Sequence, residues 1–391
     1  MAFDVSMRIV LPGMFVAIAL GSASAQPKPA PLEGATESLK LAAPSGFIDD
    51  AIGVESDRIA YVVADTGSKA ELHVVTLATK KDEVVDISGV TLSPLAIHLI
   101  GPRALIIGDA EGGKQMAAMV ELADKGKVKA GTAVYKVPAA THVTLLPKKG
   151  IAVHRVTSTS TSTRHEIELL SIDNGKRIGA VHTLELGVGD VEKKLEFRVN
   201  HWSDGWTKAY GIKGGDWDRK EDQRAPDAEA TFDMLAGKLV DKKKIDDLFE
   251  QRKRFQALAD SGGKLDFVRI EMLKEIQAWR GGKLQKIELD QPLASYDTKS
   301  LQAVVTADGV WLALKVDPVN AEAVARKKAD IEYLDIFKAG ADGKAVRKAR
   351  VLASKIRHRF GVMADGKSFY LIERNQSMDR GGKSLTVYTL P

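Results

Sequence analysis

Two pairs of arginines have the type and spacing that could bind an anion. Arg252 and Arg254 open the segment RKRFQALADSGGK, and Arg357 and Arg359 open the similar segment RHRFGVMADGK. Residues two apart in a strand point to the same side, so each pair presents two guanidinium groups together. Guanidinium groups bind carboxylate or phosphate through paired hydrogen bonds. In the alternative interpretation, these arginines form ion pairs with acids of neighbouring strands, such as Glu250.

A polar stretch at residues 213–228, KGGDWDRKEDQRAPDA, offers a second candidate site. Trp217 lies there between Asp216 and Asp218, and its indole could stack on a sugar or a peptide ring. The alternative is a packed loop that binds nothing. The acids do not form a calcium loop, because position six is Glu221 where glycine is required. We therefore predict no metal site here.

The signatures of common catalytic sites are missing from the sequence. It contains no cysteine, no H-E-x-x-H pair and no G-x-S-x-G elbow, and SDGWT (203–207) is one residue shorter than a sialidase Asp-box. His154 and His165 could be cross-strand neighbours, although core or solvated histidines are the commoner outcome. Trp202 and Trp206 are expected to pack between neighbouring sheets. We expect no cofactor, and these observations favour binding over catalysis.

The two R-x-R-F segments belong to a longer repeat. Each leads through a short strand to Ala-Asp and glycine, a turn that recurs at Ala307-Asp308-Gly309 and joins antiparallel neighbours. Strand-like segments that open a unit begin near residues 47, 93, 141, 196, 252, 299 and 356, about 46 to 57 residues apart. Further strands follow each of them. Four-stranded sheets repeated at this period predict a β-propeller.

The last repeat unit is incomplete, because the chain stops at Pro391 after three strands. The segment ATESLKLAA (35–43) precedes the first full unit and could supply the fourth strand, which would remove an exposed edge. We therefore predict an all-β fold, a seven-bladed β-propeller of four-stranded antiparallel blades whose last blade is completed by an N-terminal strand. The alternative is an array of two-sheet β-sandwiches.

One repeat unit carries a family resemblance. AYVVADTGSKAELHVVTLATKKDEVVDI (60–87) resembles a repeat of the YVTN class, a family of seven-bladed propellers in the WD-repeat-like group. The Ala-Asp-Gly turns resemble those of TolB-type propellers. The resemblance implies the propeller fold, and such families are mostly binding platforms, although fold alone does not establish function.

The first 25 residues resemble a secretion signal. Arg8 precedes the apolar run IVLPGMFVAIAL, and the small residues up to Ala25 form a cleavage site. The alternative is an uncleaved anchor. We expect a signal peptide at 1–25, a Pro-rich linker at 26–34 and the propeller at 35–391. The protein would then be periplasmic or secreted from a bacterium, with no transmembrane segment after signal removal.

Composition limits the partners. The formal net charge is +5, which suits an anionic envelope polymer or an envelope protein. Nucleic acid is not expected, because no aromatic stacking platform accompanies the basic stretches. We expect a monomer.

The longest connections should lie on one face of the propeller. Residues 213–228, 317–330 and 158–164 lengthen loops on the face that also carries the links between blades. We predict an exported, non-catalytic binding or scaffold propeller whose partner docks on this face between blades four and seven. The alternative is a propeller hydrolase or lactonase that acts on an anionic substrate at the channel mouth, where the four arginines would hold the charge.

Overall fold

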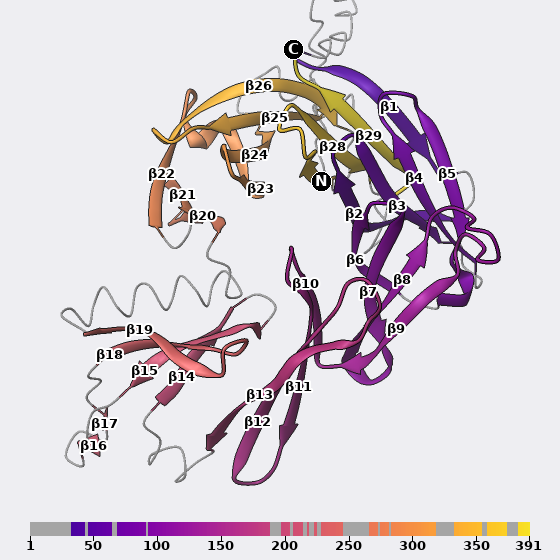
Figure 1. Cartoon of the computed structure of the whole chain (residues 1–391). Coiled ribbons are helices and arrows are strands. Elements are labelled where there is room, and N and C mark those ends of the chain that lie inside the picture. The colour runs from indigo at the N-terminus through magenta and orange to yellow at the C-terminus, as the bar shows by residue number, and fades with distance from the viewer. Residues whose placement is uncertain are drawn as a thin grey trace, which may run out of the picture.

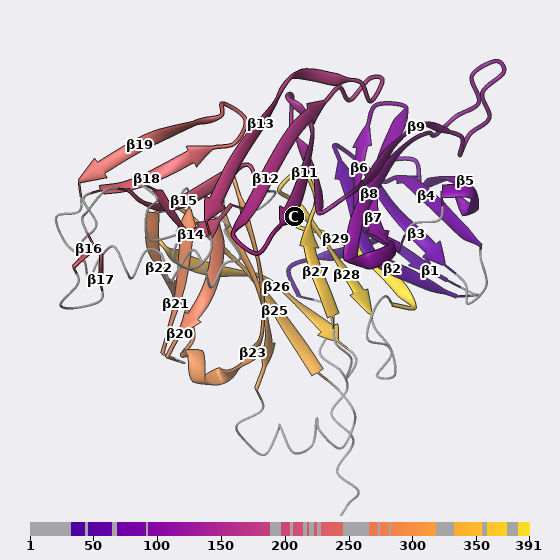
Figure 2. The same ribbon diagram turned by 90° about the horizontal axis from the view of Figure 1, so that it is seen from below.

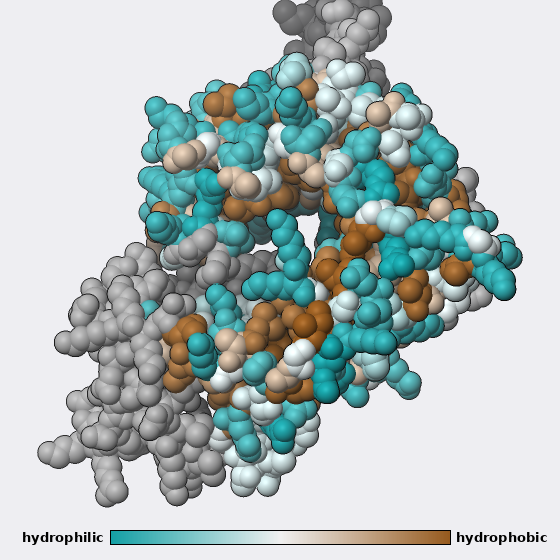
Figure 3. All heavy atoms as spheres, in the orientation of Figure 1, coloured by the Kyte–Doolittle hydropathy of each residue, from teal (hydrophilic) through white to brown (hydrophobic). Residues whose placement is uncertain are grey.

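The structure consists of small antiparallel sheets arranged around a central axis (Figure 1). In the space-filling view the ring is hollowed at its centre (Figure 3). The computed structural model describes residues 33–43, 46–64, 69–90, 93–187, 197–203, 206–213, 217–218, 223–224, 228–244, 266–272, 274–280, 283–317, 332–353, 358–373 and 382–391. The predicted signal peptide and most of the predicted linker lie outside these residues.

Blades one to three are four-stranded sheets whose strands follow in chain order. Blade one contains β2 (Phe47–Glu55), β3 (Arg58–Ala64), β4 (Ala70–Thr76) and β5 (Lys81–Asp86). Blade two contains β6 (Ser93–Ile100), β7 (Arg103–Ala110), β8 (Lys114–Glu121) and β9 (Ala133–Ala140). Blade three contains β10 (His142–Leu146), β11 (Gly150–Ser158), β12 (Ser162–Leu170) and β13 (Arg177–Gly187). Short 3₁₀ helices η1 (Ser88–Val90) and η2 (Glu111–Gly113) lie in the connections.

Blades four and five occupy the middle of the chain. Blade four contains β14 (Phe197–Trp202), β15 (Lys208–Lys213), β18 (Ala228–Asp233) and β19 (Lys238–Lys244). Its insertion contains a small hairpin of β16 (Trp217–Asp218) and β17 (Gln223–Arg224). Blade five contributes β20 (Phe267–Glu271), β21 (Glu275–Arg280) and β22 (Lys283–Leu289), followed by η5 (Leu293–Ser295). None of the helices in these described parts of the chain is long and apolar enough to cross a membrane.

Blades six and seven close the chain. Blade six contains β23 (Tyr296–Thr306), β24 (Gly309–Val316), β25 (Glu332–Ala339) and β26 (Lys344–Ala353). Blade seven contains β27 (His358–Val362), β28 (Ser368–Glu373), β29 (Ser384–Thr389) and β1 (Thr36–Ala42). Two residue pairs of β22 and β26 join blades five and six at their outer strands, in parallel.

The N-terminal strand completes the last blade, as predicted. β1 pairs antiparallel with β29, with Leu41 opposite Leu385. The all-β propeller architecture of four-stranded sheets is thus confirmed. The count of seven stays a prediction, because the strand expected to open blade five falls at residues 245–265, outside the described part of the chain.

The core lies between the blades. The middle strands carry continuous buried runs, such as residues 59–62 of β3 and 104–107 of β7, because each blade packs against a neighbour on both faces. Outer strands are more exposed, and in β13 most residues face solvent. Within one sheet, a continuous apolar run therefore marks a middle strand, and an alternating segment marks an outer strand.

The chain direction gives the ring two different faces. Connections between first and second strands, and between third and fourth strands, lie on one face, which we call the turn face. Connections between second and third strands, and the links from blade to blade, lie on the other, which we call the link face (Figure 2).

The predicted loop at 158–164 on the link face is wrong, because β11 continues to Ser158 and β12 begins at Ser162. A tight turn suffices there, since the two strands stay paired to Ser158 and Thr163.

Asp335 on β25 is fully buried at the centre of a charge network. The Nε and Nη2 groups of Arg350 donate to its two oxygens at 2.6 and 2.7 Å, and Arg347 donates at 3.3 Å. The Tyr296 hydroxyl donates at 3.2 Å. Glu33 lies 3.6 Å from Arg347, and its backbone exchanges two hydrogen bonds with Arg350. The segment before β1 is therefore attached to blade six, while β1 itself belongs to blade seven.

Candidate functional site

The structure describes only part of the predicted site. Arg252, Arg254, Arg357 and Asp216 lie outside the described residues. Trp217 and Asp218 form β16, and their backbone pairs with Arg224 and Gln223.

Arg359 is the member of the arginine set whose contacts are described. It lies on β27, is 44% exposed, and has its Nη1 3.8 Å from Oδ2 of Asp50 in blade one. The Asp50 carboxylate offsets part of the positive charge of Arg359, which would otherwise attract an anionic substrate. The anion site predicted for the four arginines stays a prediction, because the other three lie outside the described residues.

A groove on the link face of blade five is the candidate site that the structure adds. It has a volume of about 220 Å³ and is formed by the start of β21, the end of β22 and η5. We call it the blade-five groove. Its lining residues are Lys274, Glu275, Ile276, Lys286, Ile287, Glu288, Leu289, Gln291 and Leu293.

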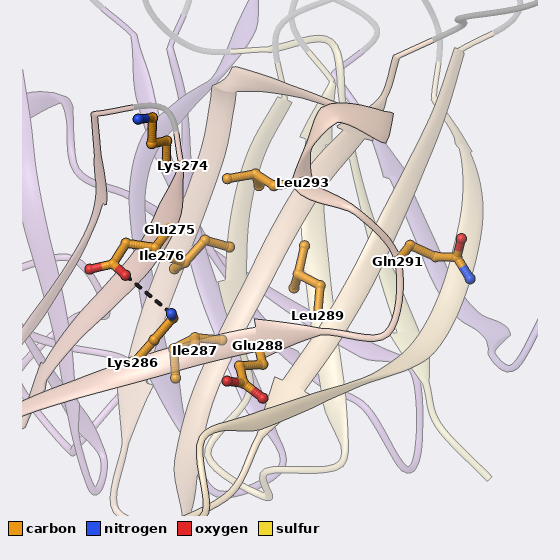
Figure 4. Close-up of a pocket in the computed structure, with 9 residues that line it drawn as sticks. All are labelled: Lys274, Glu275, Ile276, Lys286, Ile287, Glu288, Leu289, Gln291 and Leu293. Atoms are coloured by element: carbon orange, nitrogen blue, oxygen red, sulfur yellow. Dashed lines mark ion pairs between the residues drawn. The ribbon is translucent and has the colours of Figure 1, made fainter.

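The floor of the blade-five groove is apolar. Ile276 and Ile287 are buried and belong to the core between blades five and six, against which Leu289 and Leu293 pack. Figure 4 shows Ile276, Leu289 and Leu293 directed toward one another. This arrangement follows from strand alternation, because Ile287 and Leu289 share the inner side of β22 while Lys286 and Glu288 lie on the other.

The rim of the groove carries both signs of charge. Glu275 is already engaged, since Lys286 Nζ lies 3.3 Å from one of its oxygens and Gln277 donates to the other at 2.6 Å (Figure 4). Lys274 and Glu288 are exposed and form no ion pair among the described residues. These two side chains are available to a bound molecule.

An exposed methionine stands beside the groove. Met272, in the turn between β20 and β21, is 79% exposed and has a φ of 48°. This left-handed conformation is unfavourable for a residue with a Cβ. An apolar side chain presented in this way adds area that a partner could cover.

The size and lining of the groove indicate contact chemistry. Small-molecule sites usually measure about 300–1,000 Å³ and enclose their ligand, so this groove suits one or two side chains of a larger partner. Its lining offers apolar area and charged side chains, which suit contact with another protein.

A cluster of imidazole and indole rings, with two buried histidines at its centre, joins blades three and four. His154 Nε2 and His165 Nδ1 lie 3.2 Å apart and share a hydrogen bond. The rings of Trp202 and His165 pack with their centroids 4.3 Å apart and their planes tilted by 31°. Trp206 stacks on His142 at 4.7 Å and on His154 at 4.9 Å between ring centroids. The prediction that both tryptophans pack between sheets is confirmed. These contacts hold Trp206 at a φ of 58°, in the left-handed region.

Burial makes the two inner histidines hard to protonate. It lowers the pKa of His154 to about 3, with a further contribution from His165 and His142, and lowers the pKa of His165 to about 4. Both rings are therefore neutral near pH 7. The described residues contain no group of three or more His, Asp or Glu side chains placed to hold a metal ion.

These pKa values predict that acid destabilises the fold. Below the ordinary histidine pKa of 6.5, the unfolded chain binds protons that His154 and His165 in the folded chain do not. The free energy of unfolding should therefore fall as pH drops from about 6.5 to about 4, by up to about 1.4 kcal/mol per pH unit for each histidine. Urea unfolding at several pH values measures this slope. Replacing both residues by Gln should flatten it, and an unchanged slope would contradict the assignment.

No protein-family model matches the chain, and no curated protein matches it in sequence. Among solved structures the chain is similar to one from the mitotic checkpoint complex, at 10% identity and a TM-score of 0.43, over 91% of this chain and 96% of that one. It is similar to a PL25 ulvan lyase, at 9% identity and a TM-score of 0.43, over 92% and 96%. It is similar to the WD40 domain of SCAP from fission yeast, at 8% identity and a TM-score of 0.37, over 90% and 98%. These similarities concern the fold alone.

Sequence reasoning identified β22 as a strand but missed the groove. The segment GGKLQKIEL shows the alternation of a strand with one buried side. No local sequence pattern indicates that Leu293, four residues after β22 ends, packs against the apolar surface formed by Ile276 and Ile287. The only sequence signal is the apolar Leu293 in the short link before β23.

Proposed function

We propose that this protein is an exported, non-catalytic binding propeller that docks a protein partner on its link face, at the blade-five groove. The observation that carries the proposal is the apolar floor between Lys274 and Glu288, which form no ion pair within the described part of the chain, next to the exposed Met272. Buried apolar anchors surrounded by polar groups are the usual source of affinity in protein interfaces. The apolar run and small-residue site in residues 1–25 support export.

The lining specifies what a partner segment should contain. One or two aliphatic side chains would fill the floor formed by Ile276, Leu289 and Leu293. An acid on one side of them would meet Lys274, and a base on the other side would meet Glu288. A rim of both signs selects the orientation of the segment, because the reversed segment would bring like charges together.

Capture from bacterial envelope extract tests the proposal. The mature protein should retain a partner in a saturable manner, and the variant Met272→Asp/Lys274→Glu/Glu288→Lys should bind it at least about tenfold more weakly. All three side chains are exposed, so the variant should unfold at the same temperature as the parent. The control Lys81→Glu/Val84→Asp changes exposed residues of blade one, remote from the groove. Failure to capture a partner, or capture that the groove variant leaves unchanged, would refute the proposal.

A further inference from the structure

Basic side chains gather on the turn face of blades one to three. They come from four connections that are far apart in sequence, between β4 and β5, β8 and β9, β10 and β11, and β12 and β13, together with the first residue of β13. All are exposed, and none forms an ion pair among the described residues. We call this set the basic patch: Lys80, Lys127, Lys129, Lys148, Lys149, Lys176 and Arg177.

Nearby acids are largely engaged by other bases. Glu121 is buried and accepts from Arg103 at 2.7 Å, and it lies 2.9 Å from Lys125 Nζ. Glu83 lies 2.8 Å from Lys81. The turn-face carboxylates of these blades that form no ion pair with another described residue are Asp57, Asp124 and Asp173. Seven basic side chains against these three leave a clear excess of positive charge.

On the same face of the later blades, three exposed lysines are each close in sequence to a turn aspartate: Lys238, Lys344 and Lys367 lie near Asp233, Asp342 and Asp365. The basic patch differs from these turns, because its seven bases outnumber the nearby acids. The three later lysines also provide matched controls.

An apolar side chain stands within the patch. The connection of residues 122–132 projects from blade two (Figure 2). Val128, which is 40% exposed, lies between Lys127 and Lys129, and two backbone hydrogen bonds to Lys125, of 2.8 and 3.0 Å, hold this bend. Tyr135, on β9, is half-buried and donates its hydroxyl to the Ile172 carbonyl at 2.6 Å.

We propose that the basic patch seats the protein on a lipid bilayer that contains anionic headgroups, with Val128 entering the headgroup region. Lysines near an anionic bilayer are attracted to its phosphates, and an aliphatic tip adds apolar contact that a dissolved polyanion cannot supply. The basic patch lies on blades one to three, whereas the blade-five groove lies on blade five. The surface is independent of the groove and does not rest on the proposed partner.

Vesicle co-sedimentation tests the proposal with the whole mature protein. Binding to phosphatidylcholine vesicles with about 30% phosphatidylglycerol should exceed binding to phosphatidylcholine alone and should weaken as salt is raised. The variant Lys127→Glu/Lys129→Glu/Lys148→Glu/Lys149→Glu should lose at least about 30-fold in affinity. The control Lys238→Glu/Lys344→Glu/Lys367→Glu should lose less than about threefold. Equal loss in both variants, or no binding by the parent protein, would overturn the proposal.

A second variant separates a bilayer from a soluble polyanion. Val128→Asp should weaken vesicle binding several-fold more than it weakens binding to dextran sulfate, because only the bilayer offers apolar contact. If dextran sulfate binds as tightly as vesicles and Val128→Asp affects both equally, the patch recognises an anionic polymer and the bilayer proposal is wrong.

Discussion

Deletion of residues 33–42 is expected to lower the free energy of unfolding by more than about 4 kcal/mol. The deletion removes β1, which pairs with β29 through six residue pairs and packs Leu39 and Leu41 against the core between blades seven and one. It also removes Glu33, which is paired to blade six. Thermal and urea unfolding of the truncated protein measure the loss.

Removal of residues 26–32 alone is the matched control, because it shortens the chain without affecting β1. This control should unfold at the parent temperature. A synthetic peptide of residues 33–43, added in excess to the truncated protein, should restore part of the lost stability by refilling the edge of β29. Unchanged stability after deletion of 33–42 would show that β1 does not close the last blade in solution.

Replacing Asp335 by Ala is expected to destabilise the protein by about 3–5 kcal/mol. The carboxylate is fully buried, and its removal would leave the half-buried Arg350 without its acidic partner and Arg347 with Glu33 alone. The Tyr296 hydroxyl would lose its partner as well. The backbone of Arg350 exchanges hydrogen bonds with the backbone of Glu33. Loss of the Asp335 carboxylate should therefore loosen the N-terminal segment and make it easier to cleave by protease.

The control for this prediction is an exposed ion pair. Lys81 and Glu83 lie 2.8 Å apart with side chains 68% and 43% exposed, so Glu83→Ala should change stability by less than about 1 kcal/mol. Urea unfolding of both variants against the parent separates the buried pair from the exposed one. A small effect of Asp335→Ala would mean that water enters the network once the carboxylate is gone.

The two proposed surfaces have different chemistry and lie on different blades. The blade-five groove combines an apolar floor with balanced charge, whereas the basic patch combines unbalanced positive charge with a single aliphatic tip. Salt should therefore weaken vesicle binding strongly and partner binding little. The two binding activities can be measured separately on the same protein.

The sequence by itself determined the strands, their grouping into repeated sheets and the use of residues 35–43 to complete the last blade. These features are local or periodic. A strand buried on both faces needs a continuous apolar run such as residues 59–62, and a turn between paired strands needs residues such as Asp308 and Gly309. An unfinished last repeat and an unpaired first strand then leave few ways to close the ring.

Only the tertiary structure decided which side chains meet. Glu33 and Arg350 lie at opposite ends of the chain, and no local pattern indicates that they form hydrogen bonds. Ile276 and Leu293 lie on different elements, and no local pattern indicates that they line the same groove. Such neighbours depend on strand register and on how one blade packs on the next, and a shift of one residue would move each side chain to the opposite face. For this reason the strand edges could be predicted from sequence, whereas the buried charge network, the groove and the basic patch could not.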